Sequence, residues 1–305
     1  MNLQRTLTIS IITLFLISFN AFSKEVPVEI KACNDAVNKG DASTALSLAE
    51  AILTKNSTNH EGLLCKGRAQ GLNGKYEDAL ATLNTAVKST ENSFALTVSY
   101  ILIGNLHKKF HQPEAAVASY KDSLGMCAKT GNHAYTHINY NLIGGVYTQA
   151  KDFNAALDSY KSSLSSAGND NERAISFEQL ATTYSALGNA DKAIEYQVKT
   201  VVMQKQAGSL TAYADASLML GKYFFEAGNY SYAERTYKKL AQFAKDNGGA
   251  YYEAKANFYL AETVFANGDE EEAKTLFSDA NKLAKKIGAK GLVSEIDAAQ
   301  KKLNI

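Results

Sequence analysis

Two pairs of histidines have the spacing of side chains that share one face of a helix. His107 and His111 are four residues apart, and so are His133 and His137. Two imidazoles at this spacing can ligate one metal ion from a single helix. A two-histidine metal site on either pair is therefore one hypothesis. The alternative, which we favour, is that His107 packs in a core and His111 lies in a turn between helices.

The sequence contains no motif typical of a catalytic site. G-x-S-x-G and H-E-x-x-H are both absent. The stretch from Gly62 to Ala69 lacks the Lys–Ser/Thr pair of a phosphate-binding loop, and it is predicted to be helical, so its N–H groups are already used. The acidic run from Asp269 to Glu272 suits the first turn of a helix. We therefore expect a protein that is not an enzyme, without catalytic residues, resident metal or cofactor.

The first 23 residues have the pattern of a secretory signal peptide. Arg5 precedes an apolar run from Leu7 to Phe19, and Ala21-Phe22-Ser23 ends the segment with small residues at the positions that a signal peptidase reads. The run of about 13 apolar residues is shorter than the ~20 that span a bilayer. We predict cleavage and an exported protein without a membrane span, periplasmic or else secreted. An uncleaved N-terminal anchor is the alternative.

The chain is nearly neutral and contains three cysteines. Lys plus Arg total 32 and Asp plus Glu total 31, so no basic surface for nucleic acid is expected. In an oxidising compartment, Cys33, Cys65 and Cys127 leave at least one thiol unpaired within the chain. Three buried, apolar thiols are the favoured interpretation. A disulfide between Cys33 and Cys65 is the alternative.

A regular pattern of helix ends organises the rest of the chain. Seven short breaks, most of them containing Gly or Asn, lie at 39–41, 73–75, 111–113, 150–152, 187–189, 227–229 and 267–269. Each break is followed by an alanine: Ala45, Ala79, Ala116, Ala156, Ala193, Ala233 and Ala273. Twelve residues before each alanine lies a small residue: Cys33, Gly67, Gly104, Gly144, Ala181, Gly221 and Ala261. With only two prolines in the chain, this pattern predicts antiparallel helix pairs whose axes approach closely where small residues face each other.

This pattern resembles the tetratricopeptide repeat. The stretch from Asn141 to Tyr147, followed by Ala156 and Tyr160, matches its small, aromatic and alanine positions well. Seven units in the same register start near residues 26, 60, 97, 137, 174, 214 and 254. The resemblance implies an all-α, right-handed α-solenoid over residues 24–289, and residues 290–305 are expected to form a C-terminal capping helix.

The repeat register separates the two histidine pairs. His107 and His111 end the first helix of the third unit, whereas His133 and His137 begin the fourth unit. Because corresponding helices of adjacent units run parallel, the two pairs would lie roughly 15 Å apart along the helix axes. A single four-histidine metal site is therefore not expected.

The resemblance also implies where a partner would bind. In tetratricopeptide proteins the first helix of each unit lines an inner groove, and its polar positions in this chain include Asn105, Lys108, Lys109, Asn141, Glu178, Thr182 and Lys222. Asn105 and Asn141 could hold a peptide backbone through their amides, and Lys108 and Lys109 favour an acidic stretch. The alternative is that these residues only keep the surface hydrophilic.

Two functions are compatible with such a groove. The first is a periplasmic scaffold or adaptor that docks a protein or peptide partner, whose identity the sequence does not reveal. The second is an extracytoplasmic sensory binding protein that acts through a membrane receptor.

Overall fold

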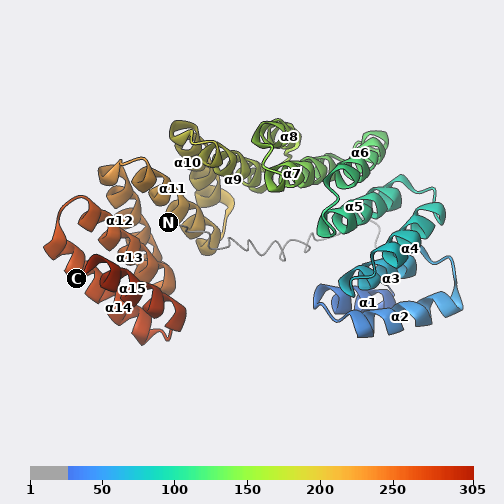
Figure 1. The fold of residues 1–305 in the computed structure, drawn as a ribbon, viewed down its shortest axis with the longest axis horizontal. Helices are drawn as coiled ribbons and strands as arrows, with labels where there is room; N and C mark the ends of the chain where they lie inside the picture. The colour runs from blue at the N-terminus through green and yellow to red at the C-terminus, as the bar shows by residue number, and fades with distance from the viewer. Residues whose placement is uncertain (1–26) are drawn as a thin grey trace. The chain divides into compact units, whose positions relative to one another are not determined.

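The computed structural model describes residues 27–305, and every regular element in that range is an α-helix (Figure 1). The predicted signal peptide, residues 1–23, lies outside the described residues. The chain divides into an N-terminal unit, whose described part is residues 27–89, and a C-terminal unit, residues 90–305. Each unit is a stack of antiparallel helix pairs, which is the all-α solenoid architecture expected from the sequence.

The N-terminal unit consists of two helix pairs, and the C-terminal unit of five pairs and a last helix. The helices of the first are α1 (Val28–Asn38), α2 (Ala42–Lys55), α3 (His60–Leu72) and α4 (Tyr76–Lys88). Those of the second are α5 (Ser93–Lys109), α6 (Pro113–Thr130), α7 (His133–Gln149), α8 (Phe153–Ser166), α9 (Asp170–Ala186), α10 (Ala190–Ala207), α11 (Leu210–Glu226), α12 (Tyr230–Asp246), α13 (Ala250–Ala266), α14 (Glu270–Lys286) and α15 (Lys290–Leu303).

Each pair is joined by a tight turn that contains one residue in the left-handed conformation. Five of these residues are glycines, and the other two are His111, with φ 58°, and Lys151, with φ 61°. Asp or Asn then caps several of the following helices; the Asp152 side chain, for example, accepts from the Ala155 N–H at 3.1 Å. His111 is thus a turn residue, and His107 is only 9% exposed, so both occupy the places that the favoured interpretation gave them.

In three pairs of the C-terminal unit, the small residue of the first helix is a glycine that faces a tyrosine ring of the second helix. A Cβ added to Gly144 would lie 2.5 Å from Cε1 of Tyr160, and Gly104 and Gly221 cover the rings of Tyr120 and Tyr237 in the same way. The alanines of the repeat are fully buried at the same crossings. Small residues meet at some crossings, since a Cβ on Gly67 would lie 3.3 Å from the Ala79 carbonyl, and at three crossings the glycine also makes room for the tyrosine four positions after the alanine.

The five pairs of the C-terminal unit start one helical turn earlier than the sequence pattern predicts. The observed first residues are 93, 133, 170, 210 and 250, whereas the predicted starts were 97, 137, 174, 214 and 254. Their first helices are 17 residues long, compared with 11 residues in α1 and 13 in α3. The extra residues of the longer repeats thus add a turn at the N-terminus of each first helix. In four of the five pairs they also lengthen the second helix to 17 or 18 residues, compared with 14 in α2 and 13 in α4.

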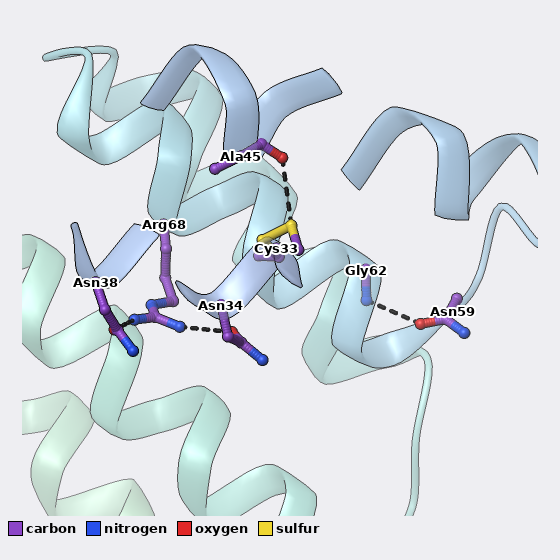
Figure 2. The surroundings of a disulfide bond; sticks show 8 residues. Cys33, Asn34, Asn38, Ala45, Asn59, Gly62 and Arg68 are labelled. Atoms are coloured by element: carbon purple, nitrogen blue, oxygen red, sulfur yellow. Dashed lines mark hydrogen bonds between the residues drawn. A yellow bond between two sulfur atoms is a disulfide. The ribbon is translucent and has the colours of Figure 1, made fainter. Parts of the chain in front are cut away.

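A disulfide joins the two pairs of the N-terminal unit. Cys33 of α1 and Cys65 of α3 are bonded, with their Cα atoms 6.3 Å apart, and both side chains are fully buried (Figure 2). Cys127 is a free, buried thiol. The favoured interpretation of three free thiols is therefore wrong, because packing places α1 directly against α3.

Candidate functional site

The seven residues predicted to contact a partner all lie on first helices of the C-terminal unit. Asn105, Lys108 and Lys109 belong to α5, Asn141 to α7, Glu178 and Thr182 to α9, and Lys222 to α11. Helix α7 contacts both α5 and α9. A hydrogen bond of 3.5 Å from the hydroxyl of Tyr223 to Oγ1 of Thr182 links α11 to α9. We call these seven side chains the A-helix face.

Asn105 is exposed, and a hydrogen bond from a buried tyrosine fixes the orientation of its side-chain amide. The hydroxyl of Tyr120 donates to Oδ1 of Asn105 at 2.7 Å. Burial raises the pKa of Tyr120 far above its usual range, so this hydroxyl stays protonated and remains a donor at neutral pH. The carbonyl end of the amide is thereby occupied, and Nδ2 has no partner among the described residues. Asn105 is available to donate to an acceptor on a ligand.

Lys108 lies beside a small cavity and lacks a counter-charge. The cavity of about 190 Å³ is lined by Lys108, His111, Pro113, Val146, Gln149 and Ala150. Nζ of Lys108 lies against Gly145, where an added Cβ would be 3.3 Å away. Burial lowers the pKa of Lys108, and within residues 27–305 no carboxylate forms an ion pair with it. A partly desolvated ammonium without a partner favours the approach of an anion.

Asn141 uses its donor group inside the protein. Nδ2 lies 2.9 Å from Nε2 of His137 and donates to the His137 carbonyl at 3.3 Å. Nε2 of this buried histidine is therefore the acceptor and Nδ1 carries the proton, 3.0 Å from Oγ of Ser163. Oδ1 of Asn141 is buried without a partner. The structure thus leaves Asn105 ready for a ligand but not Asn141, so the two amides do not form the equivalent pair that the sequence suggested.

The remaining predicted residues form a surface of mixed charge. Partial desolvation raises the pKa of Glu178, and the carboxylate of Asp215 raises it further. Nζ of Lys222 pairs with Glu226 at 3.6 Å. Lys109 is exposed, with Nζ 6.0 Å from the centre of the Phe110 ring. The distinctive combination on this face is therefore Asn105 with Lys108, three residues apart on α5.

Comparison with known proteins identifies the repeat. A tetratricopeptide repeat family model matches residues 135–206, a range that begins in α7 and ends in α10. The same helix pair, with the same left-handed turn, recurs on both sides of this range. Residues 135–206 are therefore tetratricopeptide repeats, and the rest of the described chain has the same fold. Among curated proteins, none matches its sequence.

Several solved structures share the fold of this chain. The apo form of RapI has a TM-score of 0.68 at 11% identity, covering 91% of this chain and 81% of its own. The STAND signal-transduction ATPase with a tetratricopeptide repeat sensor from Pyrococcus horikoshii scores 0.68 at 18% identity, over 89% of this chain and 43% of its own. The C-terminal part of a tetratricopeptide repeat protein from Cytophaga hutchinsonii scores 0.62 at 15% identity, over 83% and 95%.

Two residues beside the A-helix face were missed by the sequence analysis. Asp215 of α11 and Tyr252 of α13 are joined by a side-chain hydrogen bond. Burial raises the pKa of Asp215, and the hydrogen bond from Tyr252 opposes this effect. Tyr252 was missed because it lies in the extra first turn of α13, before the predicted start at residue 254. Asp215 directly follows the predicted start at 214, so the repeat register could have included it.

The rest of the described residues contain no better-formed site. Within residues 27–305, no three His, Cys, Asp or Glu side chains gather as a metal centre requires. Each helix in that range is too short or too polar to cross a membrane. An open depression of about 520 Å³ is lined by one helix only, through Ser231, Glu234, Arg235, Lys238, Lys239 and Gln242 of α12. A depression along a single helix does not bring separate elements together, so Lys108 and its cavity remain the best candidate.

Proposed function

We propose that this tetratricopeptide repeat protein is a non-catalytic periplasmic scaffold or adaptor that docks an acidic, extended peptide segment of a partner protein on its A-helix face. The observation that carries the proposal is the ammonium of Lys108, which lies without a counter-charge beside a cavity of about 190 Å³. A glutamate or aspartate side chain of the partner would supply the missing charge.

The geometry of α5 supports one mode of docking. Asn105 and Lys108 are three residues apart, so their side chains lie on the same side of the helix. Nδ2 of Asn105 would donate to a backbone carbonyl of the segment while the carboxylate reaches Lys108. A charge-assisted hydrogen bond of this kind contributes about 1.5–3 kcal/mol, so the loss of Lys108 should weaken binding on the order of tenfold or more.

Neutralisation of one lysine tests the proposal directly. The probes are a fluorescein-labelled penta-glutamate peptide and its penta-glutamine counterpart, with affinity followed by fluorescence anisotropy. We expect Lys108→Gln to weaken binding of the glutamate peptide about tenfold, and Lys121→Gln, a change at an exposed lysine of α6 outside the A-helix face, to weaken it less than threefold. Equal affinity of the wild type and Lys108→Gln would overturn the assignment of Lys108.

Cross-linked capture from a periplasmic extract tests the role of the protein as an adaptor. We expect a reproducible protein partner whose yield falls with Asn105→Ala and with Lys108→Gln. Stabilisation by a small metabolite in a thermal-shift screen, without any captured protein, would contradict the adaptor and support the sensory alternative. Cell fractionation with N-terminal sequencing tests the periplasmic location and cleavage after Ser23.

A further inference from the structure

Three exposed turns of the chain contain the dipeptide Asn-Gly. They are Asn73-Gly74 after α3, Asn247-Gly248 after α12 and Asn267-Gly268 after α13. In each turn the asparagine caps the helix, and the glycine has a positive φ, of 77°, 72° and 101° respectively. An asparagine is most reactive before glycine, because no Cβ on the next residue hinders the approach of its backbone nitrogen to the side-chain amide. The three turns share this intrinsic reactivity.

The reaction in question is an internal cyclisation followed by hydrolysis. The backbone nitrogen of the glycine gives up its proton and attacks Cγ of the asparagine, and a new N–Cγ bond forms as the Cγ–Nδ2 bond breaks and ammonia leaves with the proton. Water then opens the cyclic imide. Cleavage of the N–Cγ bond gives aspartate, whereas cleavage between the nitrogen and the backbone carbonyl gives isoaspartate. The net change replaces an amide by a carboxylate, with water as the only co-reactant and ammonia as the leaving group.

Side-chain hydrogen bonds restrain two of the three amides. Nδ2 of Asn267 donates to Oε1 of Glu234 at 3.0 Å, and Nδ2 of Asn247 donates to the Phe243 carbonyl at 2.8 Å. The side chain of Asn73 is exposed and has no hydrogen-bond partner among the described residues. Its Cγ can therefore turn toward the next backbone nitrogen without the loss of a hydrogen bond.

The backbone nitrogen of Gly74 is also held less firmly than that of Gly268. To attack, the nitrogen must leave the hydrogen bond that its N–H donates to a carbonyl three residues earlier. This N···O distance is 3.3 Å at Gly74 and 3.0 Å at Gly268. Asn73 thus meets both requirements of the reaction, a free amide and a weakly held nitrogen, and Asn267 meets neither. The turn after α12 meets one, because its backbone bond is 3.4 Å but its amide is held.

Modification at Asn73 would alter the turn between α3 and α4. The new carboxylate lies at the C-terminal end of α3, where the helix dipole disfavours negative charge. Isoaspartate also inserts one more carbon into the main chain of this turn, which is closed by a hydrogen bond of 3.0 Å from the Lys75 N–H to the Gln70 carbonyl. The longer main chain cannot keep this bond and the left-handed Gly74 in register, so the start of α4 loosens.

We propose that Asn73 is a modification site of the N-terminal unit, at which water converts the Asn-Gly turn to isoaspartate and loosens the α3–α4 pair. The site lies outside the A-helix face and does not depend on the proposed function of that face.

Peptide mapping by mass spectrometry tests the order of reactivity. The full-length protein is incubated in H₂¹⁸O at mildly alkaline pH, so that each converted asparagine carries the label, and electron-transfer fragmentation separates isoaspartate from aspartate. We expect Asn73 to convert about fivefold faster than Asn247 and about tenfold faster than Asn267, because the first competitor must break a neutral hydrogen bond and the second a hydrogen bond to a carboxylate. Conversion of Asn73 no faster than that of Asn267 would overturn the proposal.

Two controls show whether the fold sets this order. In guanidinium chloride, where the native hydrogen bonds are lost, the three asparagines should convert at similar rates. In the folded protein, Glu234→Ala should accelerate Asn267 severalfold and leave the rate at Asn73 unchanged. If the order persists in denaturant, or if Asn267 is not accelerated, the hydrogen bonds do not protect the amides and the structural assignment fails.

Hydrogen exchange measures the effect on the turn. We expect faster exchange over α4 in incubated wild type than in fresh protein, and no such change in incubated Asn73→Gln, whose longer side chain cyclises far more slowly. Asn73→Asp carries the new charge on a normal main chain and should show only part of the effect. Circular dichroism establishes that each variant is folded. Unchanged exchange over α4 in a sample that contains isoaspartate at position 73 rejects the loosening of the pair.

Discussion

Gly144 and Tyr160 fill one space at the crossing of α7 and α8. A Cβ on the glycine would lie 2.5 Å from Cε1 of the ring, which is only 2% exposed. The phenolic oxygen lies 3.1 Å from Oγ1 of Thr148, one turn after the glycine on α7. The Tyr160 ring can therefore occupy this position only because Gly144 has no side chain.

Gly144→Ala should destabilise the protein, because the new methyl group would displace the Tyr160 ring from its packed position. We expect a loss of about 1–3 kcal/mol in the free energy of unfolding, measured by urea denaturation. The matched control is Gly125→Ala in α6, where a Cβ meets nothing within 4 Å and helix propensity alone should stabilise by about 0.5–1 kcal/mol. In a Tyr160→Ala background the cost of Gly144→Ala should disappear; an unchanged cost there would show that the ring is not responsible.

The helix pairs could be predicted from the sequence because the Gly and Asn breaks and the buried alanines repeat in register. The direction of packing could not be predicted. Small residues at two positions are compatible with small against small or small against ring, and only the structure shows that Gly104, Gly144 and Gly221 lie against tyrosine rings. The extra turn at the start of each longer helix was missed because nothing in the repeat marks it.

The helix that carries each candidate site residue could be predicted, but not the partners of its side chain. The register placed Asn105 and Asn141 on neighbouring helices. It could not show that Tyr120 occupies the carbonyl of Asn105 or that His137 occupies the donor of Asn141, because these contacts depend on rotamers set by tertiary packing. The same limit applies to Asn267, whose partner Glu234 lies 33 residues before it.

The disulfide should contribute substantially to stability and leave one free thiol. Thiol titration of the denatured, unreduced protein should detect only Cys127, and all three thiols after reduction. Cys33→Ala with Cys65→Ala should lower the free energy of unfolding by about 3–4 kcal/mol, because the bond closes a loop with a sequence separation of 32. Cys127→Ala is the matched control that keeps the bond. Three reactive thiols before reduction would contradict the pairing.

Replacement of Lys151 by glycine should stabilise the protein. Lys151 occupies the left-handed turn position at φ 61°, a conformation that costs a residue with a side chain about 1–2 kcal/mol. Glycine avoids this cost, and only part of the gain is offset by the greater conformational entropy that glycine has in the unfolded chain. We expect Lys151→Gly to raise the free energy of unfolding by about 0.5–1 kcal/mol. The reverse change at the equivalent turn, Gly188→Ala at φ 74°, should lower it by about 1 kcal/mol. Tm measurements on both variants check the pair, and a loss of stability in Lys151→Gly would contradict it.

A buried polar network crosses α7, α8 and α9 and depends on a neutral histidine. His137 is 3% exposed and lies between Asn141 and Ser163, and Oγ of Ser163 is 3.0 Å from Oγ of Ser176. Burial lowers the pKa of His137 from its ordinary value of 6.5, and Glu172 at the start of α9 opposes this effect. Protonation would place two donors, Nε2–H of the imidazolium and Nδ2 of Asn141, against each other.

The sign of the resulting pH dependence follows from the lowered pKa. Since the folded protein binds this proton less readily than the unfolded chain, the stabilisation is complete above the unfolded pKa of about 6.5 and is lost as the pH falls below it toward the folded pKa. His137→Ala should cost about 1–3 kcal/mol at pH 7.5, because it leaves Asn141 and Ser163 without their partner. Urea denaturation at pH 7.5 and 5.0 measures both effects. Between these pH values the wild type should lose more stability than His137→Ala, and His133→Gln, a change at an exposed histidine of the same helix, should behave like the wild type. An equal loss in His137→Ala and wild type would mean that His137 is not the group whose protonation weakens the fold.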